Sequence, residues 1–276
     1  MRAIGARNSN TEKETKMGRK WFKRWAVFLF SLFFSCPAWA AHPLITDDTG
    51  TQGKGKFQLE VNGQYDWDRE ATEDGTVKSR SGQAAATLSY GVFDNVDLIF
   101  SLPYLWGNTE VNEVKVYNEK GIGDSTLDTK VRVWEKSGFS VALKPGISFP
   151  TGDKDKSLGT GKLGGHVYLI ASQEIGSWAL HGNLGYIRNE NDAGERRDIW
   201  HVSFASTWEV VKNLKLAADI GAERNTDWNS KNPPAFLIGG IIYSISDRLD
   251  LDLGVKFGLT EPEPDFSLMA GLTWRF

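Results

Sequence analysis

Apolar and polar residues alternate along most of the chain after residue 55, and the alternation is clearest at the carboxyl end. Between Asp265 and Phe276, every second residue from Phe266 onward is apolar. A period of two with one fully apolar face predicts a β-strand that has an apolar medium on one side only. The chain ends in phase with this face, so we expect Trp274 and Phe276 to face lipid and Arg275 to face the interior.

Eleven further stretches show the same period, so the sequence predicts twelve strands. Their approximate ranges are 57–67, 82–91, 96–106, 124–133, 139–149, 165–174, 178–186, 200–208, 214–223, 235–244, 249–259 and 265–276. The phase is weak in 165–174, and 235–244 is apolar on both sides, so its orientation stays open. An even strand number is typical of bacterial single-chain membrane barrels.

The connections between these strands alternate in length. Those after even-numbered strands are short, such as 92–95 and 246–247, whereas those after odd-numbered strands are longer and charged, such as 68–81 and 107–120. Short periplasmic turns opposite long external loops are typical of outer-membrane barrels. The sequence therefore predicts an all-β fold, a transmembrane antiparallel up-and-down β-barrel over residues 56–276, located in the bacterial outer membrane.

The faces opposite the apolar ones carry charges, which a barrel turns toward its lumen, where opposite charges pair across strands. The candidate lumen-lining and ligand-contacting residues are Asp97, Asp124, Asp128, Lys130, Arg132, Lys144, Asp219, Asp250, Asp252 and Lys256. In the alternative, a soluble sandwich, these charges would face water. Tryptophans near strand ends, such as Trp67 and Trp178, favour the barrel because aromatic residues gather at membrane interfaces.

The amino-terminal residues indicate export. A basic stretch at 20–24 precedes an apolar run at 25–34, which is too short to cross a bilayer as a helix. Residues 38–40 have the small-x-small pattern of a secretory cleavage site, so we expect residues 1–40 to be a cleaved signal peptide. Lipidation of Cys36, the single cysteine, is the alternative.

Removing residues 1–40, which hold 8 basic and 2 acidic residues, leaves 24 basic and 33 acidic residues and a net charge of −9. Such a charge argues against nucleic acid as a partner. No cysteine remains, and His166 and His181 lack metal-ligand spacing, so we expect no metal and no cofactor. The expected partners are outer-membrane lipids and a small-molecule solute.

Three short motifs lie between residues 121 and 161: Gly-Ile-Gly-Asp at 121–124, Ser-Phe-Pro-Thr-Gly-Asp at 148–153 and Ser-Leu-Gly-Thr-Gly at 157–161. In this order and spacing they resemble a family of outer-membrane transporters linked to MetA-pathway phenol degradation, over most of residues 42–276. The resemblance implies uptake of small organic molecules, including aromatic or hydrophobic ones, and supplies no binding residues. The last strand also resembles the terminal strand of outer-membrane barrels, which implies that the assembly machinery recognises Phe276.

The predicted function is therefore a channel or transporter for small organic molecules. The alternatives are a structural or adhesive barrel with a filled lumen, and a barrel lipid hydrolase. His201 and Ser203 lie two apart on one strand, and the pair resembles that of outer-membrane phospholipase A. A hydrolase needs a base that is hydrogen-bonded to its serine and oriented by a third group. The alternation turns this pair toward the lumen, away from lipid, so we expect no enzymatic activity.

Residues 41–55 are polar and glycine-rich, without periodicity, and predict an irregular segment before the first strand. Fully extended, the segment could reach roughly 50 Å, long enough to enter the lumen. We hypothesise that it partly plugs the barrel, with Asp47 and Asp48 against lumen cations. The candidate cations are Lys130, Arg132, Lys144 and Lys256. The alternative is a mobile periplasmic tail. Because His42 lies in this irregular segment, we expect it to be solvated.

Overall fold

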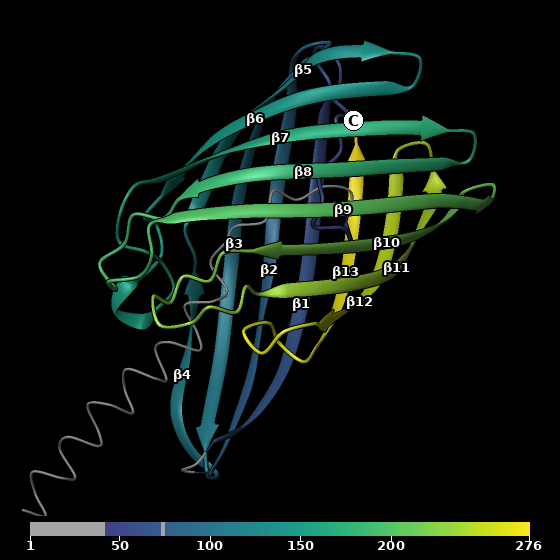
Figure 1. Cartoon of the computed structure of the whole chain (residues 1–276). Coiled ribbons are helices and arrows are strands. Elements are labelled where there is room, and N and C mark those ends of the chain that lie inside the picture. Colours follow the sequence, from purple (N-terminus) through teal and green to yellow (C-terminus); the bar gives the residue numbers. More distant parts are fainter. Residues whose placement is uncertain (1–41, 73–74) are drawn as a thin grey trace, which may run out of the picture.

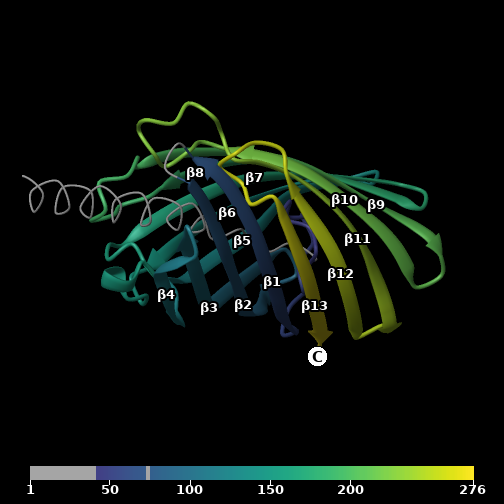
Figure 2. The same cartoon turned by 90° about the horizontal axis from the view of Figure 1, so that it is seen from below.

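The computed structural model describes residues 42–72 and 75–276, so the expected signal peptide at 1–40 lies outside the described residues. The described chain forms one antiparallel sheet that closes into a barrel (Figures 1 and 2). Closure comes from the pairing of the first strand with the last, Gln58 opposite Arg275 through Trp67 opposite Phe266. No helix among these residues has the length and apolar character needed to cross a membrane.

Nearly all of the described regular structure is strand. The strands are β1 (Phe57–Thr72), β2 (Gly75–Phe93), β3 (Val96–Val111), β4 (Val114–Ile122), β5 (Ser125–Lys136), β6 (Phe139–Phe149), β7 (Gly164–Ile175), β8 (Trp178–Arg188), β9 (Asp198–Val211), β10 (Leu214–Glu223), β11 (Ala235–Ser246), β12 (Leu249–Gly258) and β13 (Phe266–Arg275). A short 3₁₀ helix, η1 (Lys154–Lys156), lies in the loop between β6 and β7.

Thirteen strands occupy twelve positions around the wall because β4 and β5 share one of them. The carboxyl-terminal part of β3, Tyr104 to Val111, pairs with β4. The amino-terminal part, Val96 to Ser101, pairs with β5. The prediction of a twelve-stranded antiparallel barrel is confirmed, with its fourth strand broken at residues 123–124.

The prediction of long loops at 68–81 and 107–120 is wrong, because the strands continue through most of both ranges and leave only residues 73–74 and 112–113 between them. β1 and β2 stay paired as far as Thr72 and Gly75. β3 turns into β4 through Asn112 and Glu113, which both have positive φ, as a two-residue hairpin turn requires. In Figure 1 these hairpins extend past the rest of the barrel, at the end opposite the carboxyl terminus.

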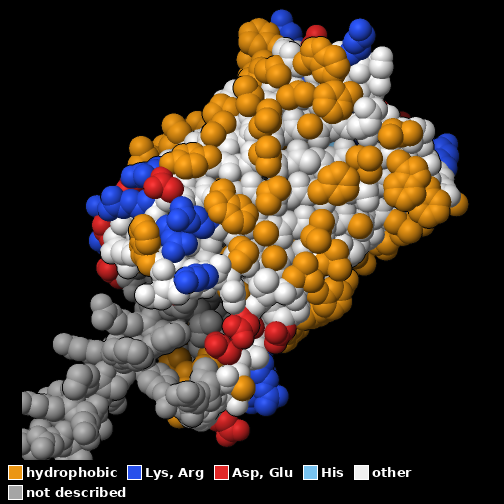
Figure 3. All heavy atoms as spheres, in the orientation of Figure 1, with side chains coloured by type: hydrophobic (Ala, Val, Ile, Leu, Met, Phe, Trp, Pro, Cys, Tyr) orange, Lys and Arg blue, Asp and Glu red, His pale blue; other side chains and the backbone are white. Residues whose placement is uncertain are grey.

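The outer face of the barrel is apolar, as the alternation predicts. Along β3, buried residues alternate with the exposed Leu98, Phe100 and Leu102. Figure 3 shows apolar side chains spread over one outer face, with charged side chains toward its ends. Trp274 and Phe276 are also exposed. An apolar exterior around a charged interior fits lipid outside and polar groups inside.

Candidate functional site in the barrel lumen

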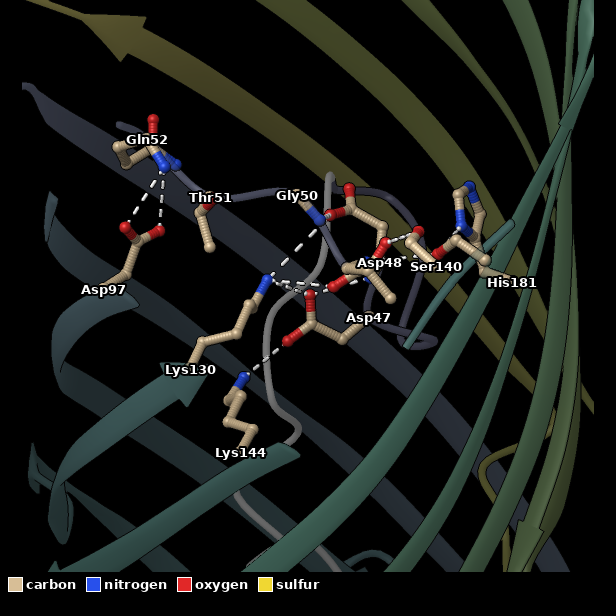
Figure 4. A network of polar contacts seen from close by, with 12 residues as sticks. Asp47, Asp48, Gly50, Thr51, Gln52, Asp97, Lys130, Ser140, Lys144 and His181 are labelled. Atoms are coloured by element: carbon tan, nitrogen blue, oxygen red, sulfur yellow. Dashed lines mark hydrogen bonds and ion pairs between the residues drawn. The ribbon is translucent and has the colours of Figure 1, made fainter. Parts of the chain in front are cut away.

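The lumen holds the segment that precedes β1, residues 42–56, which we call the inner segment (Figure 4). Its first part is almost completely enclosed: His42, Leu44 and Asp47 each expose 2% of their surface or less. The expectation that His42 is solvated is wrong, because its Nδ1 pairs with the Asp252 carboxylate on β12. The prediction placed His42 in solvent because it lies in an irregular segment, and nothing in the sequence points to its partner, 210 residues away along the chain.

Asp47 is the centre of the polar contacts. Lys130 Nζ donates to Asp47 Oδ1 and Lys144 Nζ to Asp47 Oδ2, each at 2.7 Å. The two lysines come from the neighbouring strands β5 and β6 and converge on one carboxylate (Figure 4). With its amide oriented to satisfy both atoms, Asn183 donates to the Asp47 carbonyl oxygen (2.9 Å) and accepts from the Asp47 N–H (2.6 Å). Both the side chain and the backbone of Asp47 are therefore held by the wall.

Further polar contacts hold the segment on either side of Asp47. Asp219 on β10 accepts from the Ile45 N–H (2.7 Å), the Thr46 N–H (2.8 Å) and the Thr46 hydroxyl (2.6 Å). Nearer the strand, Asp97 on β3 accepts from the Gln52 N–H at 3.0 and 3.1 Å. A wall carboxylate thus satisfies backbone groups that an irregular buried segment would otherwise leave unpaired.

Apolar contacts complete the docking of the inner segment. Leu44 packs with Ala205, Ala217 and Ile242. Ile45 packs against a cluster of Phe236, Ile238 and Met269. Phe236, Ile238 and Ile242 project inward from β11, which is why the stretch 235–244 looks apolar on both sides. That two-sided pattern was the available sequence signal that something apolar lies inside the barrel.

Inward-facing glycines give the segment room at its first residues. A Cβ at Gly254 would lie 2.6 Å from Pro43 Cβ, and one at Gly271 would lie 2.6 Å from His42 Nδ1. Real Cβ atoms do not approach other atoms so closely, so any side chain here requires the segment to move. These positions on β12 and β13 therefore form a slot for His42 and Pro43.

Asp124 does not contact the inner segment. It accepts from the Gly152 N–H (2.9 Å) and from both the N–H (2.8 Å) and the hydroxyl (2.9 Å) of Thr160. The Thr151 hydroxyl donates to the Gly123 carbonyl oxygen at 2.7 Å. The three motifs at 121–124, 148–153 and 157–161 thus meet in one place, where they fix the loop between β6 and β7.

The remaining predicted residues have other partners. Asp128 pairs with His166, Asp250 accepts from Arg275 at 2.8 Å, and Arg132 contacts Glu135 at 3.2 Å. Lys256 donates to Glu263 at 2.5 Å, and Glu263 lies in the loop after β12. Burial raises the pKa of Glu263, and the neighbouring Lys256 opposes that rise. Of the four cations proposed for Asp47 and Asp48, the structure brings Lys130 and Lys144 to them, and not Arg132 or Lys256.

Two sizeable cavities lie at opposite ends of the lumen. One, of about 680 Å³, opens beside the carboxyl terminus and is lined by Asp47, Asp48, Gln52 and Arg275 among others. The other, of about 420 Å³, is lined by residues of the loops at the far end, including Asp192. The two cavities share no lining residue, and His42 and Asp47 of the inner segment border only the first.

A second group of lumen residues includes the pair considered for catalysis. Ser203 Oγ lies 3.1 Å from His201 Nε2, and His201 Nδ1 lies 3.5 Å from Glu223 Oε2. Serine, imidazole and carboxylate thus follow one another as in a hydrolytic triad. Ser203 and His201 are buried on the inner face of β9, whereas the outer face carries the exposed Val202 and Phe204.

A closed antiparallel barrel with an apolar outside and a charged inside is a transmembrane barrel of the outer-membrane type. The chain belongs to the family described as "Putative MetA-pathway of phenol degradation", whose match covers residues 46–276. This confirms the resemblance carried by the three motifs. The protein is thus one of the bacterial outer membrane, with its apolar exterior in contact with lipid.

Solved structures support the fold. An outer membrane channel from Pseudomonas putida F1 is similar with a TM-score of 0.63 and 15% identity, over 83% of this chain and 98% of that one. The KdgM porin gives a TM-score of 0.52 and 6% identity, over 79% and 99%. The NanC porin gives 0.50 and 12%, over 78% and 98%. Among curated proteins, none matches the chain.

Proposed function

We propose that this protein is an outer-membrane channel for small organic molecules, and that the inner segment closes it. One observation carries the proposal: Asp47 is held inside the lumen by Lys130 and Lys144, where it borders the cavity of about 680 Å³ beside the carboxyl terminus. The family's description supports an organic solute, and the solved channel and porins support a pore.

The closure is reversible in this proposal, because the segment is fixed mainly by polar contacts. Holding one residue in a single backbone conformation costs about 1–2 kcal/mol, which release of the segment would recover. The segment stays attached to β1 at Phe57, so it can leave the lumen toward the periplasm and return. Solutes would then cross between the two cavities.

Deleting His42 to Gly53 tests this function. Single-channel conductance in planar bilayers should rise several-fold relative to the intact protein, and liposomes carrying the variant should admit small aromatic solutes faster. Heat-modifiable migration in gels shows whether the variant has folded. A folded variant that conducts no more than the intact protein would contradict closure by the inner segment. Absence of conductance and solute uptake in both proteins would contradict the channel and favour the structural barrel.

The proposal contains no catalytic step. Ser203 faces the lumen, so the protein and its Ser203→Ala variant should release fatty acid from phospholipid vesicles at the same background rate. Hydrolysis above background that disappears in Ser203→Ala would instead support the barrel hydrolase.

Recognition of Phe276 by the assembly machinery is likewise part of the proposal. Deleting Phe276 should lower the yield of folded protein in the outer membrane.

A further inference from the structure

The inner segment presents the chemistry of a small amphiphilic acid to the lumen wall. Its Asp47 carboxylate is held by two ammonium groups, and Leu44, three residues earlier, packs on an apolar patch. Three residues of extended chain span about 10 Å at most, so the backbones of Leu44 and Asp47 lie within about 10 Å of each other. The wall therefore offers a carboxylate site on β5 and β6 and an apolar site on β9, β10 and β11, both reached from one short stretch of chain.

The carboxylate site is specific in its geometry. Lys130 and Lys144 reach different oxygens of the same carboxylate at equal distances of 2.7 Å. Charge-assisted hydrogen bonds of this kind are short and roughly twice as strong as neutral ones. Both lysine side chains are buried, at 9% and 2% exposure. A buried ammonium group is costly unless it is paired, so this site requires an anion.

Lys144 depends on Asp47 more than Lys130 does. In the described part of the chain, Asp47 is the only carboxylate hydrogen-bonded to Lys144. The nearby Asp128 on β5 is already paired with His166. Lys130 Nζ, by contrast, also donates to the Asp48 backbone oxygen at 3.1 Å and lies 3.9 Å from Asp48 Oδ1. When the inner segment leaves, Lys144 loses its hydrogen-bonded anion.

The apolar site lies on the opposite part of the wall. Ile242 on β11, Ala217 on β10 and Ala205 on β9 surround Leu44. Inward apolar side chains are unusual in a water-filled lumen, which is normally polar. These residues would contact the body of a hydrophobic solute once Leu44 had moved.

We propose that Lys130 and Lys144 bind the carboxylate of the transported solute, a small aromatic or aliphatic monocarboxylic acid whose body rests on Ala205, Ala217 and Ile242. Asp47 occupies this site in the closed channel, so the solute and the inner segment compete for it. A tethered group acts at an effective concentration of about a millimolar, so free acid in that range displaces it. The inference rests on the proposed channel function and names its solute class.

Benzoate is the probe that tests the site. Calorimetric titration of the folded protein in detergent at pH 7 should give weak binding to the wild type. Asp47→Asn removes the competitor's charge and should bind benzoate at least about tenfold more tightly, a gain of about 1.4 kcal/mol. Benzyl alcohol, which lacks the charge, and acetate, which lacks the apolar body, should both bind more weakly than benzoate to Asp47→Asn.

The double variant Asp47→Asn/Lys144→Gln removes both partners of one ion pair, so only Lys130 loses the Asp47 charge, and heat-modifiable migration in gels shows that the variant has folded. Benzoate binding should disappear in it. Lys162→Gln, combined with Asp47→Asn, removes a lysine on the external loop and should leave benzoate binding unchanged. Unaltered affinity in Asp47→Asn, equal affinity in the Lys144 double variant, or equal binding of acetate would each overturn the inference.

The outcomes separate this inference from the channel function. The conductance of the variant lacking His42 to Gly53 depends on the pore alone and needs no benzoate. If that variant conducts but benzoate does not bind as expected, the channel function is supported and the carboxylate site is ruled out. If benzoate binds as expected but the deletion variant does not conduct, the carboxylate site is supported and the channel function is ruled out.

Discussion

The two halves of the inner segment are held in different ways. Residues 42–49 lie deep in the lumen, and side chains of the wall fix them through Asp252, Asp219, the two lysines at Asp47 and Ser140 at Thr49. Residues 50–56 lie at the mouth, where most are partly or fully exposed. There the backbone carries much of the attachment: the Gly55 N–H donates to the Gly91 carbonyl oxygen at 2.7 Å, and the Gly91 N–H donates to that of Lys56 at 2.9 Å.

This difference assigns separate roles to the halves. Backbone bonds at the mouth continue the sheet pairing of β1 and β2 and do not depend on side-chain identity, so this half behaves as an anchor. The deep half depends on particular charges and on close packing, so it behaves as a stopper. Substitutions should therefore open the channel from the deep half and have little effect at the mouth.

The largest effect is expected from Asp47→Ala. Removing one partner of a buried ion pair costs roughly 3–5 kcal/mol, because it leaves buried charge uncompensated. Here two lysines lose their partner, so the segment should leave the lumen and the open probability in planar bilayers should rise strongly. Protease cleavage within residues 42–56 should accelerate in parallel.

Asp48→Ala is the matched control. The Asp48 side chain is 36% exposed and lies 3.9 Å from Lys130, so the loss should be no more than about 1 kcal/mol. Equal effects of the two substitutions would show that the charge of the segment matters and the geometry at Asp47 does not. The division into stopper and anchor would then lose its main support.

A smaller effect is expected from Gly254→Ala in the slot for Pro43. The added Cβ would lie 2.6 Å from Pro43 Cβ, and overpacking of this kind typically costs about 1–3 kcal/mol. Conductance should rise, although less than in Asp47→Ala. Gly239→Ala on the neighbouring strand is the control, because nothing lies within 4 Å of its added Cβ, and it should conduct like the wild type. If both variants stay closed, the slot does not hold the segment.

The strands could be predicted from sequence wherever lipid lies on one side and polar lumen on the other, because that contrast imposes a period of two. The same logic fails at 235–244, where lipid lies outside β11 and Leu44 and Ile45 lie inside. It also fails in the hairpins at 68–81 and 107–120, which extend beyond the barrel. No apolar medium lies beside them there, so no alternation marks these strands.

The contacts of the lumen were only partly predictable. Charge complementarity was enough to suggest Lys130 and Lys144 as partners of Asp47. It could not exclude Lys256, since the choice depends on Glu263 lying in the loop above it. The pairing of His42 with Asp252 had no signal at all, because an irregular segment carries no periodicity that fixes the direction of its side chains.

The smallest effects come from a matched pair of threonines, one in each half. Thr49 Oγ1 shares a hydrogen bond with Ser140 Oγ at 2.5 Å in the buried half. Thr51 Oγ1 donates to the Asp94 carbonyl oxygen at 2.8 Å at the exposed mouth. Valine has nearly the shape of threonine, so Thr→Val removes the hydroxyl alone.

In Thr49→Val a buried serine hydroxyl loses its partner, which costs about 1–3 kcal/mol, whereas water replaces the lost partner in Thr51→Val. Open probability should therefore rise several-fold in Thr49→Val and stay within about twofold of wild type in Thr51→Val, since 0.4 kcal/mol corresponds to roughly a factor of two. Single-channel recordings of both variants at one voltage measure the ratio directly. In Thr51→Val, water can hydrogen-bond to the Asp94 carbonyl oxygen in place of the lost hydroxyl. A larger effect from Thr51→Val would therefore mean that the mouth, and not the deep half, controls the closure.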